Sequence, residues 1–230
     1  DKLVGKGTEQ KYTQLQAARN GLDTLRAEIE VLKQERDAFP EEARVRVLGV
    51  LDRLNDVLGS YDRFVEAFAE KAKAYARLGD PMDPATSQGP MATPTAAKFL
   101  QGQVVDAVKR GGKMVVGCSD FDVPKQGWFF APHVVAGAPQ DCPLMQEESF
   151  GPVVGILPVA NDDEAIRMMN DSEYGLTASI WTSDAQRAAR VGERVETGTF
   201  FMNRCDYLDP ALPWTGVKDT GRGATLSHYG

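Results

Sequence analysis

Cysteine and histidine are scarce in this chain of 230 residues. The three cysteines, Cys118, Cys142 and Cys205, form no CxxC pair, and neither His133 nor His228 lies near one of them. Structural zinc sites are built from clusters of these two residue types, so no metal site is expected. An odd number of widely separated cysteines is typical of a reducing compartment rather than of a disulfide framework.

An excess of basic charge and a long apolar run are also missing. The net charge of −7 argues against a surface that follows nucleic-acid phosphates. The chain has no apolar run of about 18 residues, the minimum for a membrane span, and its first residues, DKLVGKGTEQ, lack the apolar core of a signal peptide. We therefore expect a cytoplasmic protein with no nucleic-acid and no membrane partner.

The common catalytic and phosphate-binding motifs are absent as well. The glycine-rich turn Thr220-Gly221-Arg222-Gly223 has neither the P-loop lysine spacing nor the complete dinucleotide fingerprint. No GxSxG elbow is present to supply a hydrolase nucleophile. The sequence thus excludes the simplest hydrolase and nucleotidase interpretations.

What the chain does contain, before about residue 60, is a heptad pattern. Apolar residues form two rows, Leu15, Leu22 and Ile29, and Ala18, Leu25, Leu32 and Phe39. Proline at Phe39-Pro40 interrupts this helix, and a second apolar stripe then continues through Val47 and Leu58 to about Arg77. Residues 1–60 are predicted to form an α-helical hairpin or coiled coil. Either the two stripes face each other, or they recruit another chain as a coiled-coil or oligomer partner.

Beyond residue 90 helical and strand patterns alternate. Thr93-Pro94 predicts the start of a helix that buries Ala97, Leu100, Val104 and Val108 and stops at Gly111-Gly112. Short apolar runs at 114–117, 128–135, 153–159, 176–182 and 199–203 are expected strands, and helices are expected to begin at Asp162 and Asp184. This pattern predicts an α/β fold, with a largely parallel sheet and helices on both faces.

The stretch QEESFGPVVG, Gln146 to Gly155, places two carboxylates and an aromatic ring directly before an apolar strand. Glu147 and Glu148 are either exposed charges on a loop or part of a binding site. In the second case Glu148 accepts hydrogen bonds from ribose hydroxyls and Phe150 offers its ring face to a flat heterocycle. The residues alone leave both interpretations open.

Several stretches, in order along the chain, resemble one enzyme family. They are YDRFVEAFAEKAKAYARLGDPMDPATSQGP, PLMQEESFGPVVGILPV, NDSEYGLTASIWTSD and TGTFFMNRCDYLDPALPWTGVKDTGRG. Residues 61–230 closely resemble the catalytic-domain half of NAD(P)-dependent aldehyde dehydrogenases, in truncated form. Residues 1–60 do not match the family.

The resemblance implies a cofactor site and a substrate tunnel. Glu148 is expected to hold the nicotinamide ribose of NAD or NADP, with Phe150 and Leu176 close to the nicotinamide. Asp206 and Leu208 are expected along the tunnel that admits the aldehyde. Trp214 is expected at an aromatic position of that tunnel, where it would favour apolar substrates, or behind a turn in the core.

The resemblance also shows what this sequence lacks. The family's nucleophilic cysteine falls at or near Leu48, in VRVLGVLDRL, and none of the three cysteines matches the motif. The glutamate base and the nucleotide-binding half have no counterpart either, so cofactor binding by this chain alone is expected to be lost. No catalytic residue is therefore assigned.

Two functions remain. The chain is expected to be inactive alone and to serve interaction or assembly, or to be a fusion fragment, with Gly59-Ser60 as a fusion scar. The alternative is an aldehyde dehydrogenase, or a subunit of one, that oxidises an aldehyde to a carboxylic acid with NAD(P) once another chain supplies the missing parts.

Overall fold

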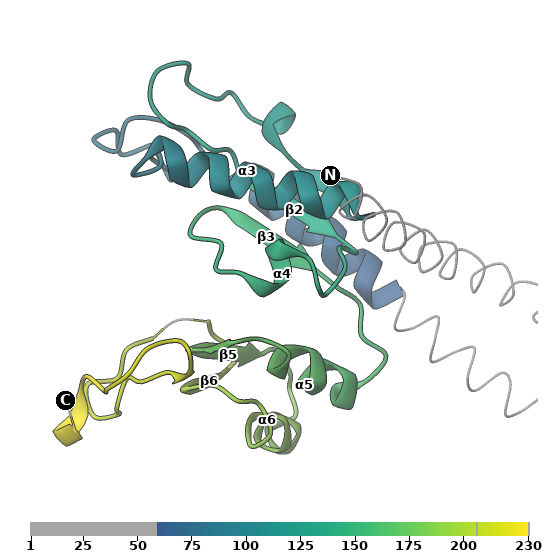
Figure 1. Ribbon diagram of the computed structural model, residues 1–230, viewed down its shortest axis with the longest axis vertical. Coiled ribbons are helices and arrows are strands. Elements are labelled where there is room, and N and C mark those ends of the chain that lie inside the picture. The colour runs from purple at the N-terminus through teal and green to yellow at the C-terminus, as the bar shows by residue number, and fades with distance from the viewer. Residues whose placement is uncertain (1–58, 206, 230) are drawn as a thin grey trace, which may run out of the picture. The chain divides into compact units, whose positions relative to one another are not determined.

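A computed structural model describes residues 59–205 and 207–229 (Figure 1). The chain divides into two compact units, Asp1–Pro158 and Val159–Gly230. The helical hairpin expected in residues 1–60 lies almost entirely outside the described residues and stays a prediction. The boundary expected near residue 60 stays one for the same reason.

The described chain opens with a helix over residues 59–75, two residues short of the predicted end. The loop that follows contacts the end of this helix: the Ser87 hydroxyl donates to the carbonyl of Tyr75 (2.8 Å), and the backbone amide of Arg77 donates to that hydroxyl (2.9 Å). These contacts satisfy backbone groups that the next helical turn would otherwise have used.

Helix α3 (Pro94–Lys109) begins and ends where the sequence predicts. The Thr93 hydroxyl accepts a hydrogen bond from the amide of Ala96 (3.2 Å), and Pro94 fills the first helical position. The chain turns away at Gly111, whose φ of 107° lies in the left-handed region that favours glycine. Leu100 and Val104 are buried as expected, whereas Val108 is 37% exposed.

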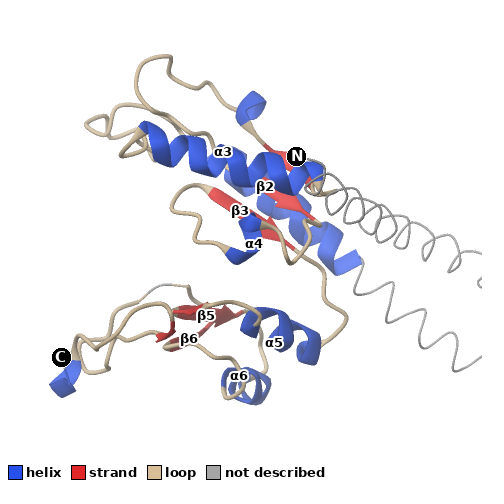
Figure 2. Ribbon diagram, viewed as in Figure 1, coloured by secondary structure: helices blue, strands red, loops and turns tan. Residues whose placement is uncertain are grey.

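Among the described residues of the first unit, three strands form one sheet, β1 (Lys113–Val116), β2 (His133–Ala136) and β3 (Val153–Ile156), in that order (Figure 2). β1 pairs with β2 antiparallel and β2 with β3 parallel. The connections carry a short 3-10 helix, η2 (Cys118–Asp120), and helix α4 (Pro143–Gln146).

Helices cover both faces of this sheet, as the sequence predicts. All four residues of β2 are buried. Val135 packs in one cluster with Leu100, Val104 and Ala107 of α3. Val134 packs in a second cluster with Ala69 of the helix 59–75. Because side chains alternate along a strand, the two clusters lie on opposite faces of the sheet.

The second unit combines short strands and two helices. Its elements are α5 (Asp162–Asn170), β4 (Tyr174–Gly175), β5 (Thr177–Ile180), α6 (Ala185–Gly192), β6 (Thr199–Met202), β7 (Val217–Lys218) and η3 (Ser227–Tyr229). β5 and β6 pair parallel, and β4 and β7 pair antiparallel. Helix α6 packs closely against β6. A Cβ added at Gly192 would lie only 2.7 Å from the ring of Phe200.

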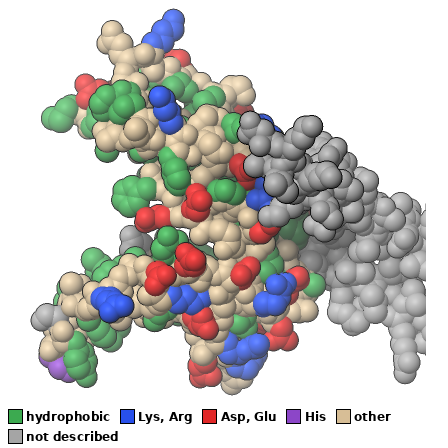
Figure 3. All heavy atoms as spheres, viewed as in Figure 1, with side chains coloured by type: hydrophobic (Ala, Val, Ile, Leu, Met, Phe, Trp, Pro, Cys, Tyr) green, Lys and Arg blue, Asp and Glu red, His purple; other side chains and the backbone are tan. Residues whose placement is uncertain are grey.

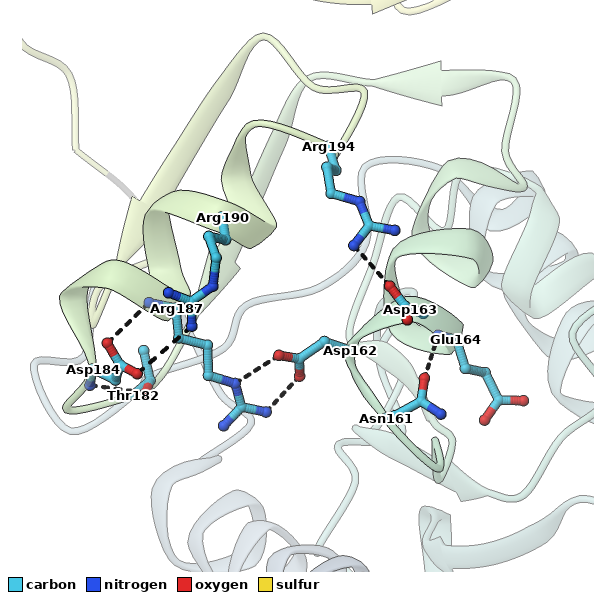
Figure 4. A network of polar contacts seen from close by, with 9 residues as sticks. All are labelled: Asn161, Asp162, Asp163, Glu164, Thr182, Asp184, Arg187, Arg190 and Arg194. Carbon is cyan, nitrogen blue, oxygen red and sulfur yellow. Dashed lines mark hydrogen bonds and ion pairs between the residues drawn. The ribbon is translucent and has the colours of Figure 1, made fainter.

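Ion pairs join α5 and α6 (Figure 4). The Arg187 guanidinium donates to both carboxylate oxygens of Asp162, with Nε 2.8 Å from Oδ2. Arg194 pairs with Asp163 at 2.7 Å. Over this unit Figure 3 shows acidic and basic side chains interspersed. The hydrogen bond from Arg187 lowers the pKa of the Asp162 carboxyl below its usual value.

The strand predictions hold in part. Residues 128–132 are not strand, because Trp128 and Phe130 use their carbonyls to accept from Met91 N (2.8 Å) and Gln88 Nε2 (2.6 Å) instead of a neighbouring strand. The expected parallel pairing is present in β2–β3 and β5–β6, but the other two pairings are antiparallel. In the described chain the strands belong to three separate sheets rather than one. None of the described helices is both long and apolar enough to cross a membrane.

Candidate functional site

The EESFGP residues form a loop that links α4 to β3. Helix α4 is short: Pro143 begins it, and the amide of Glu147 donates to the carbonyl of Pro143 (2.9 Å) as it ends. Glu147 then has φ −102° and ψ 157°, an extended conformation. In an extended segment successive side chains point to opposite sides.

One side of this loop is fixed to helix α3. The Ser149 hydroxyl donates to Oε1 of Gln103 (2.8 Å), and Nε2 of the same amide donates to Glu147 (3.5 Å). Gly151 lies against the helix so closely that an added Cβ would lie 2.2 Å from Cδ1 of Leu100. Residues 147, 149 and 151 therefore all contact α3.

The other side of the loop is open to solvent. Glu148 is exposed, and Phe150 is 82% exposed. Glu147 and Gly151 are exposed as well, so Glu148 and Phe150 differ from them in lacking a contact with α3. The carboxylate can accept hydrogen bonds from ribose hydroxyls and the ring can pack on a planar group, which fits the nicotinamide end of NAD or NADP.

Leu176, the third expected cofactor residue, lies in the second unit between β4 and β5. It is 40% exposed, and with Tyr174, Thr177 and Thr197 it lines an open pocket of about 350 Å³. Its carbonyl accepts from the amide of Thr199 (3.0 Å), which fixes the backbone at this position.

The expected tunnel residues follow β6 in the same unit. Leu208 is 54% exposed. Trp214 is half-buried and its backbone pairs with Thr225, with N–O distances of 2.7 and 2.9 Å. Asp206 lies outside the described residues. The structure thus brings Glu148 and Phe150 together on one loop, and it places Leu176, Leu208 and Trp214 in the other unit.

The cysteines lie in different environments. Cys142 is fully buried at the N-terminus of α4, and burial raises the pKa of its thiol. Cys118 and Cys205 are exposed and unbonded. Leu48, the position expected for the family's nucleophile, lies outside the described residues. Across residues 59–205 and 207–229 no group of three His, Cys, Asp or Glu side chains could hold a metal ion.

Gln103, which contacts the loop, was not predicted from the sequence. Gln103 is 2% exposed, and it occupies the apolar face of α3 together with Leu100, Val104 and Ala107. A polar residue inside a helical apolar stripe was the available signal, because such a residue needs a buried hydrogen-bond partner.

Comparison with known proteins agrees with these observations. The model of the family described as "Aldehyde dehydrogenase family" matches residues 57–230. The succinate-semialdehyde dehydrogenase [NADP(+)] of Mycobacterium avium is 40% identical over 170 residues, which cover 74% of this chain and 35% of that protein. An aldehyde dehydrogenase of Paenarthrobacter nicotinovorans is 37% identical over 171 residues, which cover 74% of this chain and 36% of that protein.

Solved structures give the same result. Succinic semialdehyde dehydrogenase from Streptococcus pyogenes, in complex with NADP+, superposes with a TM-score of 0.69 at 36% identity, covering 74% of this chain and 37% of that one. An aldehyde dehydrogenase of Mycobacterium tuberculosis complexed with NAD+ gives 0.68 at 31% identity, covering 74% and 35%. The chain spans about a third of the length of the relatives it matches. On the match over residues 57–230, this chain belongs to the aldehyde dehydrogenase family.

Proposed function

We propose that this chain provides the part of an aldehyde dehydrogenase catalytic domain that receives the nicotinamide end of NAD or NADP. Glu148 binds the ribose hydroxyls, and Phe150 packs beside the nicotinamide. The observation that carries this proposal is the loop itself, which contacts α3 through Ser149 and Gly151 and leaves Glu148 and Phe150 exposed without such a contact. When bound, the cofactor supplies the hydride acceptor for aldehyde oxidation.

The second unit, considered by itself, holds the other residues that the family resemblance implicates. Leu176 lines an open pocket of this unit, and its place close to the nicotinamide stays a prediction. Leu208 and Trp214 line the approach of the aldehyde in this proposal, and Asp206, outside the described residues, is expected there too. The half-buried Trp214 favours apolar substrates because its ring offers a large apolar area. The relatives named for succinate semialdehyde and for NADP+ support an aldehyde substrate and a dinucleotide cofactor.

The chain alone does not oxidise aldehydes in this proposal. Oxidation needs a thiolate that attacks the carbonyl and a base that activates it. The nucleophile is expected at or near Leu48, where the sequence has no cysteine, and the thiol of Cys142 is buried with a raised pKa. An assay of NADH or NADPH formation with aliphatic and aromatic aldehydes should not exceed a blank without protein. Turnover that a thiol-blocking reagent abolishes would contradict this and would assign the nucleophile to one of the exposed cysteines.

A second function, completion by another chain, is favoured by the sheet of the first unit. Among the described residues β3 pairs only with β2, so one edge of an apolar strand, Val153–Ile156, has no strand neighbour. Open apolar edges are templates for pairing with another segment. Co-expression with a chain that carries a family nucleotide-binding half and nucleophile should give a co-eluting complex with aldehyde-dependent activity. Separate elution and no activity would leave the first proposal alone.

A further inference from the structure

Gln103 is a polar residue that is buried in the first unit among apolar side chains. It lies in the middle of α3, on the helix face that packs under β2, and only 2% of it is exposed. A buried amide is costly unless its donors and acceptor are used. Its partners therefore indicate why this position is polar.

Both partners of Gln103 belong to the EESFGP loop. Its Oε1 accepts from the Ser149 hydroxyl at 2.8 Å, and its Nε2 donates to the Glu147 carboxylate at 3.5 Å. The first is an ordinary hydrogen bond and the second is at the long limit for one. Glu147 and Ser149 are the residues on either side of Glu148.

A second attachment lies at the next residue that faces α3. Gly151 packs directly on Leu100, which leaves no room there for a side chain. Two backbone hydrogen bonds tighten the same segment: the amide of Gly151 donates to the carbonyl of Ser149 (2.7 Å), and that of Val153 donates to the carbonyl of Gly151 (2.8 Å). Ser149 and Gly151 thus contact α3 closely, and the exposed Glu147 is reached by the longer contact from Gln103.

We propose that Gln103 is a positioning residue, which holds the loop in the conformation that presents Glu148 and Phe150 outward. This inference rests on the proposed function for its purpose, but the attachment itself can be tested without a cofactor. A carboxylate held in place before binding loses less conformational freedom when it meets a ribose. Gln103 touches neither cofactor nor substrate and acts through Glu147 and Ser149.

The test is amide hydrogen exchange of the full chain, read on the peptide that covers residues 147–153. Gln103→Leu keeps the side-chain volume and removes both hydrogen bonds. Ser149→Ala removes only the hydrogen bond between Ser149 and Gln103, by changing the loop residue. The matched control is Gln101→Leu, an exposed position on the same helix. Loss of one such bond should speed exchange at Gly151 and Val153 by about two- to tenfold, while the Gln101→Leu control and the other peptides of the first unit keep the wild-type rates.

Several outcomes would overturn the inference. Unchanged exchange in both Gln103→Leu and Ser149→Ala would show that the loop is held without this amide. Faster exchange spread evenly over all peptides of the first unit would show a general loss of stability instead of a local attachment. Failure of the proposed function gives a different result, in which the loop loosens as expected but Glu148→Gln has no effect on nucleotide binding in the completed enzyme.

Discussion

At the residue scale, the three cysteines differ in what surrounds them. Cys142 is fully buried between α3, α4 and β2, and the loss of solvent around it raises the pKa of its thiol. Cys118 and Cys205 are both exposed. Since the thiolate is the reactive form, burial protects Cys142 twice, by limiting access and by disfavouring ionisation.

Thiol labelling should separate these environments. In the native chain an alkylating reagent near pH 8 should modify Cys118 and Cys205, and Cys142 only after unfolding, as read by peptide mass spectrometry. Raising the pH to about 9 should still leave native Cys142 far slower than Cys118 and Cys205, because burial limits access of the reagent to its thiol. Cys118→Ser serves as the control for peptide assignment. Labelling of Cys142 as fast as that of Cys205 would contradict the burial described here.

Individual site residues were predictable from the sequence only where a motif carried them. Glu148 and Phe150 belong to a short motif, and the structure leaves both exposed on one loop, while their role in binding stays a prediction. Gln103 was not predicted because its importance comes from Ser149 and Glu147, more than 40 positions away in the chain. No local pattern encodes such a contact.

At the element scale, the polar contacts between α5 and α6 make the stability of the second unit depend on pH. The Arg187 guanidinium donates two hydrogen bonds to the Asp162 carboxylate. Asp162 lies in the first turn of α5, where the helix dipole also favours a carboxylate. The folded-state pKa of Asp162 is therefore lowered. Its contribution is present above the unfolded pKa of about 3.9 and is lost as pH falls through the folded value.

Asp162→Asn should accordingly lower the free energy of unfolding at pH 7 by at most about 1 kcal/mol, because solvent screens a pair that is roughly half exposed. The difference from wild type should shrink below about pH 4 and vanish once Asp162 is protonated in the folded state. Glu173→Gln, an exposed carboxylate of the same unit, removes the same charge as a control. Thermal melts across this pH range check the prediction, and a deficit that stays constant down to the acid limit would contradict it.

Element boundaries followed local chemistry well where a cap was present. Thr93-Pro94 begins α3, and the acidic residues at Asp162 and Asp184 mark α5 and α6. The expected strand 128–135 was too long because contacts with Gln88 and Met91 occupy its first half. Those contacts depend on tertiary structure, which apolar runs do not report.

At the scale of the whole molecule, the pairing of strands was the least predictable feature. Apolar runs joined by helices indicate parallel pairs, and β2–β3 and β5–β6 are such pairs. The antiparallel partners β1 and β7 and the separation into three sheets among the described strands follow from which segments meet in space.

The heptads of residues 1–60 predict an interaction segment. The solution mass of the full chain, compared with that of a variant without residues 1–40, would test this prediction.

We propose that this chain holds only the nicotinamide end of a cofactor site. One carboxylate at a ribose contributes about 1–3 kcal/mol through hydrogen bonds to a charged group, whereas even a millimolar dissociation constant requires about 4 kcal/mol. Glu148 alone therefore cannot hold a dinucleotide at micromolar concentration.

Isothermal titration calorimetry of the full chain with NAD+ and with NADP+, for wild type and Glu148→Gln, tests this claim most directly. We expect no saturable heat at micromolar concentration with either nucleotide, and no difference between the two proteins in binding or in melting temperature. A micromolar dissociation constant that Glu148→Gln weakens about tenfold, which corresponds to about 1.4 kcal/mol, would contradict the claim and show that this chain contains a complete nucleotide site.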